Sequence, residues 1–160
     1  MKRISAGILM YRRPAPTVLE VLLVHPGGPI WAKKDLTAWS IPKGEITENE
    51  DLQTAALREF QEELGSLPKG ELIGLGEITQ ASGKIVHAWA VEGDLDTAKI
   101  ISNTFEMEWP PRSKKMQQFP EVDRAEFFPP DIARKKINPA QVEFIDRLEK
   151  YLAQQSRASR

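Results

Sequence analysis

The chain has 160 residues, of which 41% are hydrophobic and 28% are charged, a composition typical of one globular domain and not of a disordered chain. Its 22 basic and 23 acidic residues leave a net charge of -1, so the molecule has no general attraction for DNA or an anionic membrane, and any phosphate binding must be local. The sequence has no cysteine and two histidines, which excludes disulfides, thiolate metal sites and multi-histidine metal sites.

The N-terminus and the hydropathy predict a soluble, cytoplasmic protein. The first residues, MKRIS, carry charge and are followed too soon by Gly7 to resemble a signal peptide. No apolar run approaches the roughly 18 residues of a membrane span. We therefore expect no membrane partner.

Apolar and β-branched runs predict strands over residues 4–11 and 18–24, and the second run, VLEVLLV, is apolar enough to be buried on both faces. A short strand is expected at 39–41 before Pro42, and a hairpin at 72–79 and 84–91 around the turn at 81–83. Further strands are expected at 105–109 and, at a sheet edge, at 125–128. The polar, basic segment 112–120 favours a loop.

Two helices are expected. The residues TENE at 47–50 form a capping box, which predicts a helix from Thr47 to Leu64 with Gly65 as its stop. Asn138 and Pro139 open a second helix with apolar residues at helical spacing as far as Leu152, before a polar tail over residues 155–160 that we expect to be frayed. This order predicts a single domain over residues 1–160, either α+β or an α/β sandwich.

Glu59, Glu62 and Glu63 fall on one side of the first helix. Carboxylates three and four residues apart repel each other, and the last turn of a helix disfavours anions. A divalent cation bound by these oxygens would explain the arrangement, and Mg²⁺ or Mn²⁺ suits such ligands. The alternative is a solvated acidic face, which is common on helices.

The segment SIPKGE at 40–45 precedes this helix. Gly44 permits a close backbone approach, so its carbonyl is a candidate for the same metal shell. Lys43 is a candidate to meet a phosphate oxygen. The alternative is an ordinary turn.

Together these residues resemble the box of the Nudix hydrolases. That box is a glycine, five residues, a glutamate, seven residues, and then Arg-Glu-(apolar)-x-Glu-Glu-x-Gly-(apolar). Here it is formed by Gly44, Glu50 and the run REFQEELGS at 58–66, with Ser66 as the one departure from the family pattern.

The resemblance implies a Nudix-type α/β/α sandwich with a mixed central sheet, and hydrolysis of a nucleoside diphosphate linked to another group. It implies that Glu59, Glu62 and Glu63 bind Mg²⁺ or Mn²⁺ with help from the Gly44 carbonyl. Arg58 would orient a glutamate, and Glu50 would support that network or complete the helix cap.

Many Nudix enzymes take a further acid from a loop, as a metal ligand or base. The segment FPEVD at 119–123 resembles such a segment, which makes Glu121 the candidate. The alternative is a surface glutamate. Glu106 and Glu108, which would share one face of a strand, are rival candidates.

Several residues outside the box are candidates for substrate binding. Aromatic platforms for a nucleobase include Tyr11 and Trp39, and lysines that could clamp a polyphosphate include Lys33, Lys34, Lys43 and Lys114, although each is also explained as core or solvated surface.

The pattern WSIPKGE with a later PEVD looks like bacterial Nudix proteins grouped with diadenosine polyphosphate hydrolases. Alternative substrates are a nucleoside triphosphate, a 5′-triphosphate RNA end or an inositol pyrophosphate. A nucleotide-sensing Nudix-fold module and a protein-interaction scaffold are the non-enzymatic alternatives. We expect a monomer or homodimer that acts on a small-molecule nucleotide.

Overall fold

Alternate residues of the two long N-terminal strands belong to two separate hydrophobic cores. The computed structural model describes residues 3–158 and places β1 at Ile4–Ala15 and β2 at Val18–Pro26. Leu9 and Leu23 belong to one core, whereas Ile8 and Leu22 belong to the other. Both faces of these strands are therefore covered, as the apolar run at 18–24 predicted.

The central sheet is mixed. It contains β3 (Lys43–Glu45), β4 (Ile73–Thr79), β5 (Ile85–Glu92) and β8 (Val122–Phe128) in addition to the two long strands. The strand order is β4-β5-β1-β2-β8, with β3 paired to β1 beside this path. The β1–β5 pair is parallel and the others are antiparallel. Because β3 pairs with β1, its residues lie at the sheet just before the first helix.

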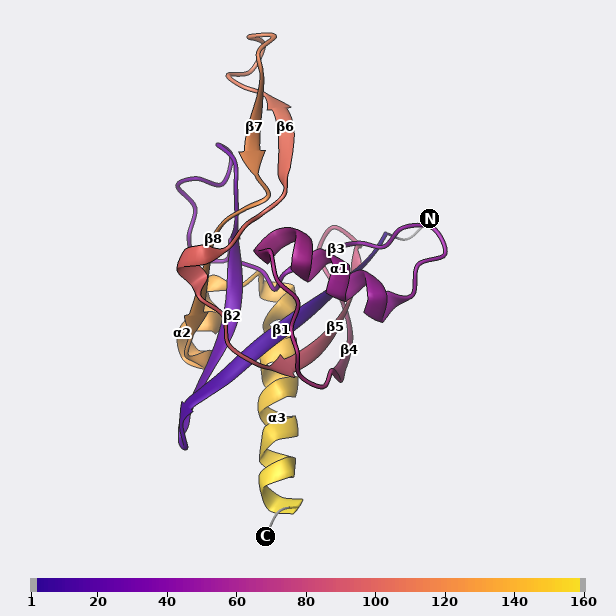
Figure 1. Cartoon of the computed structure of the whole chain (residues 1–160), viewed down its shortest axis with the longest axis vertical. Coiled ribbons are helices and arrows are strands. Elements are labelled where there is room, and N and C mark those ends of the chain that lie inside the picture. The colour runs from indigo at the N-terminus through magenta and orange to yellow at the C-terminus, as the bar shows by residue number, and fades with distance from the viewer. Residues whose placement is uncertain (1–2, 159–160) are drawn as a thin grey trace.

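Helices cover both faces of this sheet (Figure 1). On one face, α1 (Leu52–Leu64) contributes Ala56, Phe60 and Leu64 to the core. On the other face lie α2 (Pro130–Lys136) and α3 (Val142–Ala158), and α3 buries Phe144 and Leu148. Two short 3-10 helices are also present: η1 (Thr97–Lys99) follows β5, and η2 (Pro139–Gln141) leads directly into α3. The predicted α/β/α sandwich with a mixed sheet is confirmed.

The start of the acidic helix differs from the prediction. The helix begins at Leu52, with Asp51 as its N-cap accepting from the Thr54 nitrogen at 3.1 Å. Asn49 has a φ of 63°, a left-handed conformation that no helix can contain. The residues Thr47 and Glu50 do bond to each other, but within a turn that precedes the helix. The predicted stop at Gly65, with a φ of 85°, is confirmed.

Residues 104–120 form a hairpin that projects from the body of the molecule, which we call the arm (Figure 1). Its strands are β6 (Thr104–Glu108) and β7 (Met116–Pro120), which pair only with each other. The expectation of a loop at 112–120 is therefore wrong for 116–120. Cross-strand pairing, which a local composition does not reveal, made this segment a strand.

Two further expectations are corrected, and one helix had not been expected. Residues 39–41 make only isolated bridges, Val24 with Ser40 and Trp39 with Ile137, and the strand follows at β3. The helix α2 was not predicted. The tail is helical as far as Ala158, and residues 159–160 of the expected frayed segment lie outside the described residues. No helix among residues 3–158 combines the length and hydropathy needed to cross a membrane.

Candidate active site

Two of the three predicted glutamates are buried. Glu59 and Glu63 are 9% and 8% exposed, because they lie on the side of α1 between its core face and solvent. The carboxylate of Glu59 lies against Gly44, where a Cβ atom would overlap it. Only glycine allows this approach of the β3 backbone to the helix.

Glu63 lies next to the same strand. Its Oε2 accepts a hydrogen bond from the Lys43 backbone nitrogen at 2.9 Å. Burial, and then the nearby Glu59, raise the pKa of Glu63 well above its ordinary value. Burial also raises the pKa of Glu59, although Arg58 opposes this shift. The two acids are thus held in a position that favours a positive partner for both.

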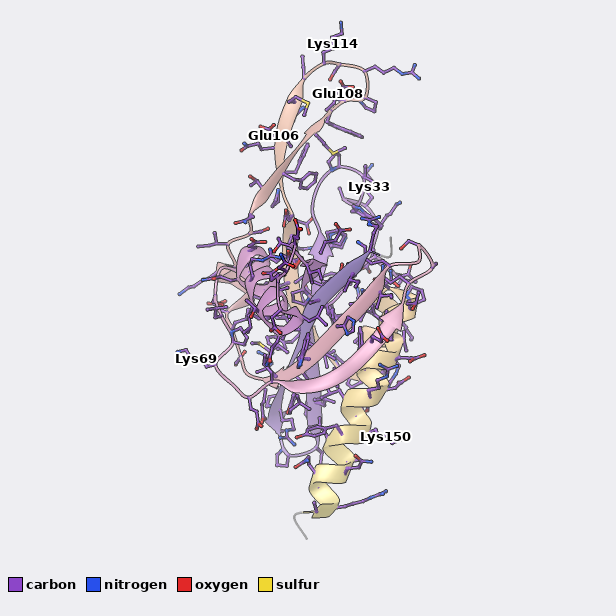
Figure 2. All side chains as sticks on the ribbon, turned by 90° about the vertical axis from the view of Figure 1, so that its right-hand side faces the viewer. Lys33, Lys69, Glu106, Glu108, Lys114 and Lys150 are labelled. Atoms are coloured by element: carbon purple, nitrogen blue, oxygen red, sulfur yellow. The ribbon has the colours of Figure 1, made fainter. Side chains whose placement is uncertain are left out.

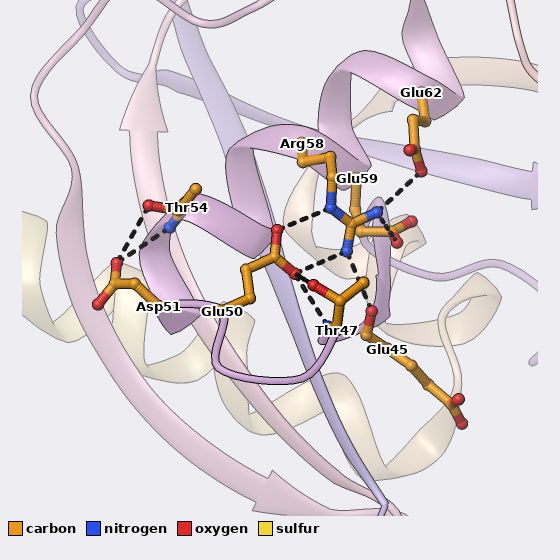
Figure 3. Close-up of polar contacts among 8 residues, drawn as sticks. All are labelled: Glu45, Thr47, Glu50, Asp51, Thr54, Arg58, Glu59 and Glu62. Atoms are coloured by element: carbon orange, nitrogen blue, oxygen red, sulfur yellow. Dashed lines mark hydrogen bonds and ion pairs between the residues drawn. The ribbon is translucent and has the colours of Figure 1, made fainter.

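Arg58 fixes the remaining geometry (Figure 3). Its Nε and Nη2 bond to both oxygens of Glu50 at 2.8 and 2.9 Å. Its Nη1 donates to Glu59 at 2.8 Å and to Glu62 at 3.1 Å, and Nη2 also reaches the Glu45 carbonyl at 3.2 Å. One guanidinium therefore orients two box glutamates, while Glu50 serves both the network and the turn at Thr47.

Glu121 lies near these glutamates although it is distant from them in the sequence. Its backbone nitrogen donates to Asn103 at 2.8 Å, and the Asn103 nitrogen donates to the carbonyl of Glu62 at 2.7 Å. Burial, and then the charge of Glu62, raise the pKa of the Glu121 carboxyl. The structure therefore places four carboxylates within electrostatic reach of one another.

A cavity of about 240 Å³ adjoins this cluster, and Lys43, Glu63 and Glu121 contribute to its lining. Burial lowers the pKa of the Lys43 ammonium, and Lys84 lowers it further. Residues that the sequence analysis did not select also line it: Ser40, Gln80, Asn138 and Gln141. The cavity thus combines one lysine and two carboxylates with several amide and hydroxyl groups, a set that suits a polar ligand.

Gln141 holds one wall of the cavity in place. It is fully buried, its Oε1 accepts from the Ile41 nitrogen at 3.0 Å, and its Nε2 donates to Gln80 at 3.0 Å. The sequence analysis assigned it no role in the site. Its partners lie 100 and 61 residues away, so no local pattern could have found this role.

The residues predicted to bind substrate lie in different environments, some buried and some on exposed loops. Trp39 is fully buried, donates from Nε1 to Asp35 at 2.8 Å and forms part of the cavity wall, so it is not an exposed platform. Lys33 and Lys34 lie on the exposed loop after β2, and the Lys34 ammonium lies 4.9 Å from the Trp31 ring centroid.

Two predicted residues are not brought to the cluster. Tyr11 belongs to the core and lines a different cavity, beside Tyr151 of α3. Lys114 lies at the tip of the arm, and Figure 2 shows it at the end of the molecule, with Glu106 and Glu108 along the same hairpin. The cavity beside the box is lined by Glu121 and by neither of its rivals.

The donor set suits a divalent cation. Burial, and then neighbouring carboxylates, raise the pKa of Glu59, Glu63 and Glu121, and Glu59 occupies space that only a glycine leaves free. Among residues 3–158, however, no three carboxylate or imidazole groups already form a metal shell. Arg58 Nη1 donates to one oxygen of Glu59 and one oxygen of Glu62, and its positive charge offsets the repulsion between these two carboxylates.

Acid side chains around a small cavity with a lysine are suited to work on a phosphate chain. The chain belongs to the NUDIX domain family, whose model matches residues 1–148. It is thus a Nudix hydrolase of nucleotide pyrophosphate bonds, and hydrolases of this family generally use divalent metal ions. The search of curated proteins gave no match.

Solved structures of the same fold include a C. elegans Ap4A hydrolase binary complex, with 20% identity, a TM-score of 0.66, and coverage of 93% of this chain and 98% of that one. The NUDIX domain of Shewanella oneidensis NrtR complexed with ADP ribose has 17% identity, a TM-score of 0.64 and coverage of 95% and 89%. A mutT/nudix family protein from Listeria innocua has 15% identity, a TM-score of 0.63 and coverage of 98% and 97%. These similarities establish the fold.

Proposed function

We propose that this protein hydrolyses the polyphosphate chain of a dinucleoside polyphosphate, with diadenosine polyphosphates as the best candidates. The observation that carries the proposal is the group of four carboxylates, Glu59, Glu62, Glu63 and Glu121, beside a cavity that also contains Lys43. The similarity to an Ap4A hydrolase and the residues WSIPKGE and PEVD support this substrate class.

The same four carboxylates and the Gly44 carbonyl are the proposed ligands of Mg²⁺ or Mn²⁺. A divalent cation in this position supplies positive charge to the phosphates and makes water more acidic. Arg58 positions Glu59 and Glu62 through its two bonds from Nη1. The role of Gly44 is twofold, since it also leaves room for the Glu59 carboxylate.

The remaining groups have separate proposed roles. Glu121 completes the ligand set or takes the proton of the attacking water, because it faces Glu62 from outside the helix. Lys43 binds a phosphate oxygen in the cavity. Asn138 is positioned on the cavity wall to bond to a polar edge of the nucleotide, while Gln141 holds that wall in place through its own bonds to Ile41 and Gln80.

We further propose that the 160 residues act as a single domain in the cytoplasm, on a free nucleotide, as a monomer or homodimer. The near-neutral net charge supports a small-molecule substrate over a nucleic acid.

A substrate panel with product identification tests the proposal. With Mg²⁺ present, we expect diadenosine tetraphosphate to be cleaved with a higher kcat/KM than nucleoside triphosphates, a 5′-triphosphate RNA or an inositol pyrophosphate. A higher kcat/KM on one of those three would replace the substrate while keeping the reaction class.

The same panel separates an enzyme from a sensor or a scaffold. Tight nucleotide binding without turnover on any substrate would identify a sensing module, which is the second candidate. Absence of Mg²⁺ and Mn²⁺ binding by calorimetry would favour a scaffold with an acidic helix.

A further inference from the structure

A second cavity, of about 300 Å³, lies between the loop that follows β2 and the arm. We call it the arm recess, and its main walls are Ile30 and Trp31 of the loop and Phe105 and Met107 of β6. Ile30 and Trp31 are 54% and 39% exposed. Two large apolar side chains are therefore exposed to solvent beside the proposed active site. Adjacent exposed apolar groups of this kind are typical of a ligand-binding groove.

Close backbone packing fixes the two walls of the arm recess relative to each other. Gly28 has a φ of 96°, and a Cβ atom there would lie 2.9 Å from the ring of Phe105. At Gly27, a Cβ would overlap the carbonyl oxygen of Pro120 in β7. The Gly27 nitrogen also donates to the Glu121 carbonyl at 2.9 Å. The backbone of the loop is thus packed closely against the arm, and this packing positions the two walls of the recess.

A buried histidine holds the loop from the other side. His25 is fully buried, its Nε2 donates to the Lys34 carbonyl at 2.6 Å, and its Nδ1 lies 2.8 Å from Asp123. Asp123 lies on β8, two residues after Glu121 in the sequence. The loop that presents Trp31 is therefore connected through His25 of β2 to β8, the strand that directly follows Glu121.

The arm recess adjoins the active-site cavity. Both cavities are lined by Pro26, Trp31 and Glu121. On the active-site side the lining adds Lys43 and Glu63, whereas the recess adds only apolar groups and glycine. Lys34, whose ammonium lies over the Trp31 ring, is available to a phosphate that passes between them.

We propose that the arm recess binds the second nucleobase of a dinucleoside polyphosphate, while the scissile phosphates lie at the carboxylate cluster; this inference rests on the proposed function. A cavity near 300 Å³ is at the lower limit for ligand sites, which suits one flat heterocycle better than a whole nucleotide. Aromatic and thioether side chains bind the face of a base without selecting its sequence of donors and acceptors.

Charge argues against the phosphates as the occupant. Glu121 is the one charged residue that lines the recess among the described residues, and it is an acid. A phosphate placed there would meet a like charge and no cation. The base end of the substrate is therefore the end that the recess favours.

Steady-state kinetics on two recess variants test the proposal. For Met107→Ala and Phe105→Ala we expect KM for diadenosine tetraphosphate to rise about tenfold, the usual effect of losing one stacking partner. The inhibition constant of ATP, which carries a single adenine, should stay within about twofold in the same assay. The matched control is Met116→Ala, a methionine of the same arm that is 61% exposed and lines no part of the recess.

Each other result has a distinct meaning. Cleavage of diadenosine tetraphosphate with an unchanged KM in both variants, or an equal loss of ATP affinity, would overturn the recess proposal and leave the proposed function standing. Failure of the wild-type protein to cleave diadenosine tetraphosphate would overturn the proposed substrate, and the recess proposal with it. A dimer in sedimentation that Met107→Ala dissociates, with KM unchanged, would assign the recess to a second copy of the chain instead.

Discussion

The carbonyl oxygen of Glu62 accepts a hydrogen bond from the backbone nitrogen of Asn103 at 2.7 Å. This bond satisfies one of the carbonyls that the end of a helix leaves without a partner. Asn103 in turn accepts from the Glu121 nitrogen at 2.8 Å. The end of α1 and the loop acid are therefore held together by backbone, which makes the position of Glu121 relative to Glu62 a property of the fold.

Replacing a box glutamate should separate activity from stability. For Glu62→Gln and Glu63→Gln we expect kcat to fall by at least about 100-fold, because each removes a proposed metal ligand. Thermal unfolding should be unchanged or shifted upward, since burial already disfavours the charge of Glu63. The control is Glu126→Gln, an exposed glutamate on β8. Wild-type kcat in either variant would remove these residues from the reaction.

A single methyl group at Gly44 should disturb the site. Gly44→Ala places a Cβ atom where the Glu59 carboxylate lies, so Glu59 must move and we expect at least a tenfold loss of kcat with weaker Mn²⁺ binding. Gly74→Ala in β4 is the matched control, because nothing lies within 4 Å of its added Cβ. Equal activity in the two variants would show that the approach of Gly44 to Glu59 has no catalytic value.

The loop acid can be tested against its rivals. Glu121→Gln should lower kcat by about 100-fold if Glu121 is a ligand or base. Glu106→Gln should leave kcat unchanged, because Glu106 lies on the projecting arm (Figure 2). Single-turnover measurements would show whether the chemical step is the one slowed. A normal rate for Glu121→Gln would reduce it to a surface residue.

The ion pair of Glu50 with Arg58 should make stability depend on pH in the acid range. Hydrogen bonds from Arg58, and then from the Thr47 backbone, lower the pKa of Glu50 from 4.5 to about 2. The ionised form is thus favoured in the folded protein, and its contribution is present above pH 4.5 and lost as the pH falls towards about 2.

Thermal unfolding of Glu50→Gln against the wild-type protein measures this contribution. The variant should unfold at a lower temperature at neutral pH, and the difference should shrink below pH 4.5 and close near pH 2. Glu48→Gln, an exposed residue of the same turn, is the control. A difference that does not vary with pH would mean that Glu50 acts through packing and not through its charge.

The parts of the site that one helix and one turn contain could be predicted from the sequence. Glu59, Glu62 and Glu63 follow from helical spacing, and the roles of Gly44 and Gly65 follow from backbone conformation. The helix start was misplaced because the left-handed Asn49 interrupts the pattern that its neighbours suggest.

The parts that depend on distant contacts could not be predicted. Gln141 reaches a backbone group 100 residues away, and Tyr11 is taken into the core by packing that its own segment does not specify. Lys114 is carried away from the site because residues 104–120 pair as an arm. The extent of the domain, the location in the cell and the oligomeric state stay predictions.

The central claim is that the acids of α1 and Glu121 hold a divalent cation on which pyrophosphate cleavage depends. The most direct measurement is the rate of diadenosine tetraphosphate cleavage by protein stripped with EDTA and then titrated with Mg²⁺, alongside calorimetric Mn²⁺ titration of the wild-type protein and Glu63→Gln. We predict no cleavage after stripping, full recovery with Mg²⁺, and Mn²⁺ binding that the substitution weakens by at least about tenfold. Undiminished cleavage by the stripped protein, or equal Mn²⁺ affinity in the two proteins, would contradict it.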